Sequence, residues 1–190
     1  SKLDIQSPEI GLELHGNIQI DSSWTLDLQG NWRLAGFEFH PMNGSVAATG
    51  PLMDPHLELG VQSPADIRIG ADFADLLENP QWTAKLLAKD VDLSTLIVDC
   101  PKIELASVKG DLAGSLENYR GQVVADGTWD TFQGLHLESD LAGDLLGIEF
   151  KSLHIDYQDS SAQTTGGKIS WQDIFSWKGR FLFKNVDPSG

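Results

Sequence analysis

The sequence predicts an all-β protein made of an array of antiparallel strands. Three observations predict it: apolar and polar residues alternate over most of the 190 residues, turn dipeptides divide the alternating stretches, and one motif recurs. Successive side chains of a strand point to opposite faces, so alternation gives a strand one apolar and one polar face. Turn signals about every 8–12 residues are typical of all-β arrays.

The first long alternating stretch runs from Ile18 to Leu34, with its apolar residues on one parity. The parity reverses at Ala35-Gly36, after which Phe37 and Phe39 continue the pattern. A glycine at such a reversal predicts a bulge or a turn.

Further alternating stretches follow along the chain, at Leu57–Val61, Ile67–Phe73, Ile103–Leu105, Leu135–Leu137, Leu146–Phe150, Leu153–Tyr157 and Ile169–Trp171. Turns are predicted between strands at Asn43-Gly44, Gly50-Pro51, Asp54-Pro55, Ser63-Pro64, Asp126-Gly127 and Gly166-Gly167. Helical spacing is scarce. It predicts two short helical turns, at Phe73–Leu77 before Pro80 and at Leu93–Ile97 before Pro101.

The composition excludes several function classes. With 13 Lys+Arg against 28 Asp+Glu the net charge is −15, which would repel nucleic acid phosphates and an anionic membrane surface. The single cysteine, Cys100, excludes an internal disulfide framework and a multi-thiolate zinc site. It lies beside Pro101 with no basic cluster in the sequence around it, so we interpret it as a structural thiol. The 41% apolar content is enough for a folded protein.

Catalytic and metal-binding motifs are scarce. The sequence has no Gly-x-Ser-x-Gly elbow, His-Glu-x-x-His motif, phosphate loop or dinucleotide fingerprint. Three histidines are each followed two residues later by an acid, on the polar parity: His56 with Glu58, His136 with Glu138 and His154 with Asp156. A pair is short of the three or four ligands of a stable metal site. We therefore predict no cofactor, no metal and no catalytic residue.

A repeat indicates that the strands belong to a longer, solenoid-like array. The segment from Trp82 to Ser94 can be laid over that from Trp177 to Ser189, with Trp, Leu, Lys, Val, Asp and Ser coinciding. We predict one elongated β module, residues 1–190, cut from a longer repeat protein. Its repeat units are predicted at about 11–80 and 81–175, with a third beginning at 176.

The repeat motif resembles the TamB-like translocation and assembly module family, a branch of the AsmA-like superfamily. The resemblance is carried by the Trp-x3-Leu/Phe-Leu-x-Lys-Asp/Asn-Val-Asp units at Trp82 and Trp177, by Val108–Gly114, and by Gly167–Trp171. It covers residues 80–190 well and residues 11–60 more loosely. These motifs mark repeat boundaries and are not catalytic signatures.

The resemblance implies a sheet folded lengthwise into a trough (a β-taco) with an apolar interior and a polar exterior. It also implies a location in the periplasm of a diderm bacterium, in a protein anchored in the inner membrane. The implied partners are phospholipid acyl chains or an outer-membrane protein client. An outer-membrane barrel partner would be met through parts of the full-length protein outside this chain. We therefore expect a non-enzymatic segment of a hydrophobic conduit or scaffold that supports lipid transport and outer membrane biogenesis.

The apolar parity names the residues expected to line the hydrophobic groove: Ile18, Ile20, Leu26, Leu28, Leu34, Leu57, Leu59, Ile67, Ile69, Ile103, Leu105, Ile148, Phe150, Ile155, Ile169 and Phe181. In a closed two-sheet sandwich the same residues would fill a core, and periodicity does not distinguish the two. Two alternative functions stay open: a β-solenoid or sandwich that binds a protein or glycan as adhesin modules do, and an acidic β-solenoid hydrolase.

Overall fold

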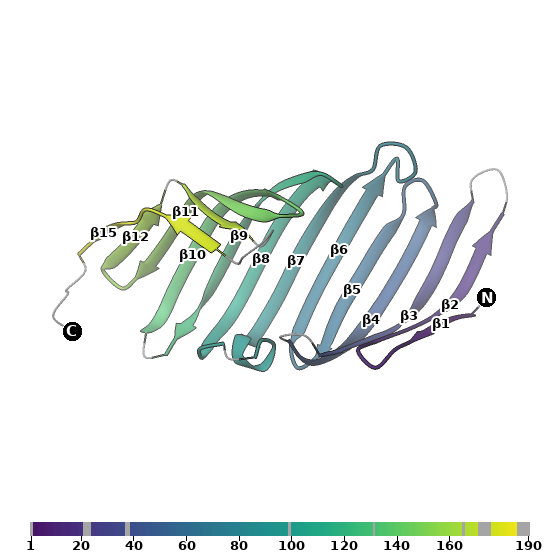
Figure 1. The fold of residues 1–190 in the computed structure, drawn as a ribbon, viewed down its shortest axis with the longest axis horizontal. Coiled ribbons are helices and arrows are strands. Elements are labelled where there is room, and N and C mark those ends of the chain that lie inside the picture. Colours follow the sequence, from purple (N-terminus) through teal and green to yellow (C-terminus); the bar gives the residue numbers. More distant parts are fainter. Residues whose placement is uncertain are drawn as a thin grey trace.

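The computed structural model describes residues 2–20, 24–36, 39–98, 100–130, 132–164, 166–170 and 176–185. Within them the chain forms a single open sheet of 15 strands, and every pair of neighbouring strands runs antiparallel (Figure 1). The all-β antiparallel prediction is confirmed. None of the helices in this part of the chain is long and apolar enough to cross a membrane.

The strands follow one another in space in nearly the order of the sequence, as hairpins added side by side along the long axis (Figure 1). Their bounds are β1 Lys2–Gln6, β2 Ile10–Gln19, β3 Thr25–Gly36, β4 Phe39–Pro51, β5 His56–Ser63, β6 Asp66–Ala74, β7 Gln81–Asp92, β8 Ile103–Ser115, β9 Asn118–Trp129, β10 Phe132–Asp144, β11 Gly147–Tyr157, β12 Ser160–Thr164, β13 Gly167–Ser170, β14 Ser176–Gly179 and β15 Leu182–Lys184.

The sheet forks at β11. The second half of this strand pairs with β12, through Leu153–Tyr157, and its first half pairs with β13, through Gly147–Phe150. β12 continues to β15, whereas β13 continues to β14. In Figure 1 the strands at this end run at a steep angle to β5–β7, because the sheet twists and curves along its length.

Two of the predicted turns are wrong, because their glycines lie inside strands. Asn43-Gly44 is within β4 and Asp126-Gly127 is within β9. Both dipeptides lie at irregular pairing: the register shifts between Asn43 and Gly44, and again opposite Gly127. In both places the extra residue lies on the partner strand, Gln62 in β5 and Ala106 in β8, so the glycine continues its own strand opposite a bulge. The predicted turns at Gly50-Pro51, Asp54-Pro55, Ser63-Pro64 and Gly166-Gly167 do fall between strands or at a strand end.

Two other boundaries differ from the predictions. The stretch from Ile18 to Leu34 is not one strand but the facing parts of β2 and β3, with Ile18 opposite Leu26. Conversely, the stretches Leu146–Phe150 and Leu153–Tyr157 belong to one strand, β11, apart from Leu146, which lies in the preceding turn. A register shift within β11 explains the change of parity. The expected bulge at Ala35-Gly36 is confirmed by the register shift there.

The helical predictions are half right. Leu93–Thr95 forms one turn of 3₁₀ helix, η1, which the Asp92 carboxylate caps by accepting a hydrogen bond from the Ser94 backbone N–H at 2.9 Å. The other predicted helical turn, at Phe73–Leu77, is instead part of the tight β6–β7 connection. The Glu78 N–H closes this connection by donating to the Asp75 carbonyl at 3.2 Å.

Candidate functional site

One face of the sheet is apolar from β2 to β13, and we call it the apolar face. Its side chains lie opposite one another in rows that cross the strands. One row crosses eight strands, β4 to β11, through Val46, Leu59, Ile69, Leu86, Gly110, Val123, Ser139 and Leu153. The opposite face, the polar face, carries the charged residues of the same strands.

The residues predicted to line a groove fall on the apolar face, in strands β2, β3, β5, β6, β8, β11 and β13. Two of them lie outside strands. Ile20 follows the end of β2 and is 73% exposed, and Phe181 lies between β14 and β15, half-buried. Whether these residues contact a lipid or a client stays a prediction.

The groove prediction left out the apolar residues of β7. Trp82, Ala84, Leu86 and Ala88 alternate on one parity and cross the apolar face from Trp82, which lies near one rim. Their alternation was available in the sequence, but this segment was interpreted only as a repeat motif. Tyr119 at the start of β9 was also missed, because the glycines at positions 121 and 127 interrupt the apolar alternation of that strand.

The apolar face has almost no second layer over it. The chain exposes 12,786 Å², whereas a compact monomer of 20.7 kDa exposes about 8,900 Å². The excess of about 3,900 Å² arises because a single sheet exposes both of its faces. The closed-sandwich alternative is therefore wrong for the part of the chain that the structure describes.

In the described part of the chain one connection covers part of this face between β4 and β8, and the face is also partly enclosed at the fork, where Thr164 is buried. The β7–β8 connection folds over the strand ends at one rim, where Leu96, 8% exposed, packs with Ala65, Ala88 and Val91. The Leu96 carbonyl also accepts a hydrogen bond from the His40 N–H at the start of β4, at 2.9 Å. We call Leu93–Val98 the cap. It covers one rim between β4 and β8 and leaves the centre of the apolar face open.

Polar groups on the apolar face are satisfied internally. The Trp32 indole N–H lies 3.2 Å from both the Ser45 and Gly60 carbonyl oxygens, and the Trp82 indole donates to the Ser115 carbonyl at 2.9 Å. The buried Ser139 hydroxyl donates to the Ser152 carbonyl at 2.9 Å. A molecule on this face therefore meets hydrocarbon with few polar handles, because these donors are already used.

A small cavity of about 260 Å³ opens on the apolar face at the fork. Phe150, Ile169 and Phe181 line it, three of the residues predicted for the groove. Larger hollows lie on the polar face, including one of about 730 Å³ flanked by Lys85, Asp111 and Arg120. Another, of about 1,140 Å³, lies at the strand ends of one rim.

The polar face carries the three predicted histidine–acid pairs. Nε2 of His56 lies 3.6 Å from Glu58, and Nε2 of His136 lies 3.3 Å from Glu138. Each of these two rings also has a closer carboxylate on the next strand, at 2.7 Å: Asp72 for His56 and Asp126 for His136. The hydrogen bond that the His56 ring makes to the Asp72 carboxylate raises the pKa of His56, and the hydrogen bond that the His136 ring makes to the Asp126 carboxylate raises the pKa of His136.

The third pair, His154 with Asp156, lies at 2.8 Å. In the described ranges no group of three or more His, Cys, Asp or Glu side chains is placed to hold a metal ion. Cys100 is a half-buried free thiol. We call these cross-strand contacts between histidines and acids the histidine ladders. They lie on a solvated surface and act by attraction between charged side chains.

Comparison with known proteins assigns the chain to a family. The family model described as "TamB, N-terminal domain" matches residues 1–190. No curated protein and no solved structure matches the chain. The second copy of the repeat motif falls largely outside the described residues, since these omit the Trp177 side chain and residues 186–190. The repeat boundaries thus stay a prediction.

Proposed function

Because the chain belongs to the TamB family of envelope translocation and assembly modules, we propose that it is a non-enzymatic segment of a hydrophobic conduit between the inner and outer membranes. The proposed cargo is phospholipid, whose acyl chains lie along the apolar face. The conduit would support outer membrane biogenesis from the periplasm, as part of a protein anchored in the inner membrane. The outer-membrane barrel partner would bind other parts of the full-length protein.

One observation carries this proposal: among the described residues a continuous apolar face crosses the sheet from β2 to β13, and the cap lies over one rim and leaves the centre open. An apolar surface of this extent on a soluble protein marks a site where another apolar molecule binds. Acyl chains suit it, since each methylene gains about 0.8 kcal/mol on leaving water. Ten methylenes on the apolar face would then contribute about 8 kcal/mol.

The face also suits movement along it. The Trp32 and Trp82 indoles and the Ser139 hydroxyl already donate to backbone carbonyls, so a chain that slides past them breaks no hydrogen bond. The protein has a net charge of −15, and the acidic residues that the polar face carries, such as Glu58 and Asp72, keep that face solvated.

A photo-crosslinking amino acid tests the proposal in cells that carry the full-length protein. It is placed at Leu28, Ile69 or Ile155 of the apolar face. The matched controls are Gln29, Arg68 and Asp156, each one residue away and thus on the polar face. We expect lipid adducts at the apolar positions and none at the controls. Lipid adducts at equal yield on both faces, or protein adducts alone at the apolar positions, would contradict an acyl-chain conduit.

A further inference from the structure

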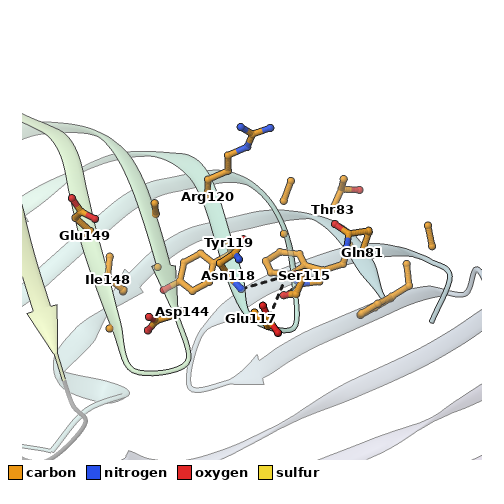
Figure 2. A pocket seen from close by; sticks show the side chains of 18 of the residues that line it. Gln81, Thr83, Ser115, Glu117, Asn118, Tyr119, Arg120, Asp144, Ile148 and Glu149 are labelled. Carbon is orange, nitrogen blue, oxygen red and sulfur yellow. Dashed lines mark hydrogen bonds between the residues drawn. The ribbon is translucent and has the colours of Figure 1, made fainter. Parts of the chain in front are cut away.

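One large cavity lies where the apolar face meets solvent. It occupies about 1,140 Å³ at one rim, between the end of β6 and the start of β11 (Figure 2). Its lining combines aromatic side chains of the apolar face, Phe73, Trp82 and Tyr119, with charged side chains of the polar face. In Figure 2 Arg120 and Glu149 project from one side of the strand ends. The register places Asp144 on that polar face, opposite Asn118, and Tyr119 on the apolar face, opposite Gly143.

The register explains how this cavity opens across the rim. The β8–β9 and β10–β11 hairpins both turn here, so the ends of β9 and β10 lie side by side with no connection between them. In the pairing of these ends Tyr119 is opposite Gly143, Asn118 is opposite Asp144, and Arg120 is opposite Ala142. At two of these three positions a large residue on β9 thus faces a small one on β10, which gives the Tyr119 ring room to lie over Gly143.

On the side of the apolar face, two aromatic rings line this cavity. The Trp82 and Tyr119 rings lie 6.4 Å apart, with the Trp82 indole N–H held by the Ser115 carbonyl. A Cβ at Gly143 would come within 2.6 Å of Tyr119 Cζ, so the ring lies over that glycine. Trp and Tyr favour boundaries between apolar and wet surroundings, because one end of each ring system is polar.

On the side of the polar face, the cavity is lined by both a basic and acidic side chains. No carboxylate of the described residues lies within ion-pair distance of Arg120, although the protein has more than twice as many acids as bases. Asp144 and Glu117 line the cavity at the strand ends. Burial and the Asp144 carboxylate raise the pKa of Tyr119, which agrees with a carboxylate close to the apolar wall.

We propose that this rim cavity binds the headgroup of an amine-bearing, zwitterionic glycerophospholipid whose acyl chains lie on the apolar face. Arg120 takes the phosphate, Asp144 and Glu117 take the ammonium group, and the Trp82–Tyr119 pair contacts the glycerol and the first methylenes. A guanidinium suits phosphate because its planar N–H groups donate in pairs. The carboxylates disfavour an anionic headgroup that brings no cation of its own.

This inference rests on the proposed function, and a three-lipid experiment separates the two. The purified protein is mixed with vesicles that contain equal amounts of phosphatidylethanolamine, phosphatidylglycerol and diacylglycerol, and the lipids captured by the protein are extracted and counted. Diacylglycerol has the chains without the headgroup. Absence of diacylglycerol uptake would contradict the apolar-face conduit itself, whatever the headgroup site does.

For the headgroup site we expect capture of phosphatidylethanolamine over phosphatidylglycerol by about tenfold, the effect of one charge-assisted contact. Arg120→Gln should lower the capture of both phospholipids relative to diacylglycerol by about tenfold. The double change Asp144→Asn and Glu117→Gln should reduce the preference to about one. Arg33→Gln, on the polar face of β3 and outside the cavity, is the matched control and should change neither ratio.

Equal capture of the two phospholipids by the unmodified protein, or a preference for phosphatidylglycerol, would overturn the headgroup site. So would unchanged ratios in the Arg120 and Asp144/Glu117 variants. Circular dichroism spectra and urea unfolding midpoints equal to those of the unmodified protein would show that a loss of capture is not a loss of folding.

Discussion

At the scale of single residues, glycines allow aromatic side chains to lie flat on the apolar face. Trp32 lies opposite Gly44, and its indole N–H reaches carbonyls of the next two strands. A Cβ at Gly44 would overlap the Gly60 carbonyl oxygen and lie 2.9 Å from Trp32 Cε2. The sheet therefore depends on the absence of a side chain at this position.

Gly44→Ala should accordingly destabilise the protein by about 1–3 kcal/mol, since the added methyl group has no space. The matched control is Gly70→Ala in β6, where the nearest atom to a Cβ is His56 Cε1 at 3.8 Å. That change should stay within about 0.5 kcal/mol. Urea unfolding of both variants measures the difference, and equal stabilities would contradict the packing described for Trp32.

The histidine ladders make stability depend on pH. Asp126 at 2.7 Å and Glu138 at 3.3 Å raise the pKa of His136 above its usual value near 6.5, and Asp156 of β11 lies opposite it. A raised pKa means that the folded state binds the proton more tightly than the unfolded state. This contribution is therefore fully present below about pH 6.5 and is lost as the pH rises through the folded pKa.

His136→Gln should remove that contribution. Between pH 5.5 and 8.0 the urea midpoint of the unmodified protein should fall more than that of His136→Gln. The comparison variant is His15→Gln, because His15 lies on the polar face of β2 with no ion pair among the described residues. It should retain the full pH response. The interpretation fails if the pH responses of His136→Gln and the unmodified protein coincide.

At the scale of elements, the cap packs a second layer on the sheet at one rim. The Asp92 carboxylate accepts from both the Ser94 N–H and hydroxyl, at 2.9 and 2.6 Å, and fixes the turn that directs Leu96 onto Ala88 and Val91. The cap thus stabilises the rim of β4–β8 without closing the apolar face.

Leu96→Ala should destabilise the protein by about 2–3 kcal/mol, through lost burial and the cavity left behind. Ile97, the next residue, is 36% exposed, and Ile97→Ala should have an effect of less than about 1 kcal/mol. Thermal or urea unfolding gives both values. A larger effect at Ile97 than at Leu96 would mean that the cap packs differently on the sheet.

At the scale of the whole molecule, the sequence was sufficient to predict the all-β class and the apolar face. Alternation fixes which residues share a face, and this holds even where the boundaries are wrong, as in the split of Ile18–Leu34 between two strands. Strand boundaries are predicted wrongly where one dipeptide is compatible with two structures. Asn43-Gly44 can form a turn or lie at a bulge in the pairing of two strands, and the pairing with β5 decides between them.

The candidate site could be predicted only in part. The alternation of apolar and polar residues identifies residues of the apolar face, such as Leu59 and Ile69. An open sheet and a closed sandwich give the same alternation. The rim cavity was outside the reach of sequence reasoning, because Arg120 and Asp144 come together only through the register of β9 with β10. Nothing in their spacing along the chain marks them as neighbours.

The central claim is that acyl chains lie on the apolar face. The most direct test is the quenching of indole fluorescence by phospholipid brominated along its acyl chains, which quenches only the indoles it touches. Trp82 lies on this face near the rim where β7 begins, so brominated lipid should quench the protein more than the same lipid without bromine, and Trp82→Phe should reduce the difference. Equal fluorescence with the two lipids would contradict the claim.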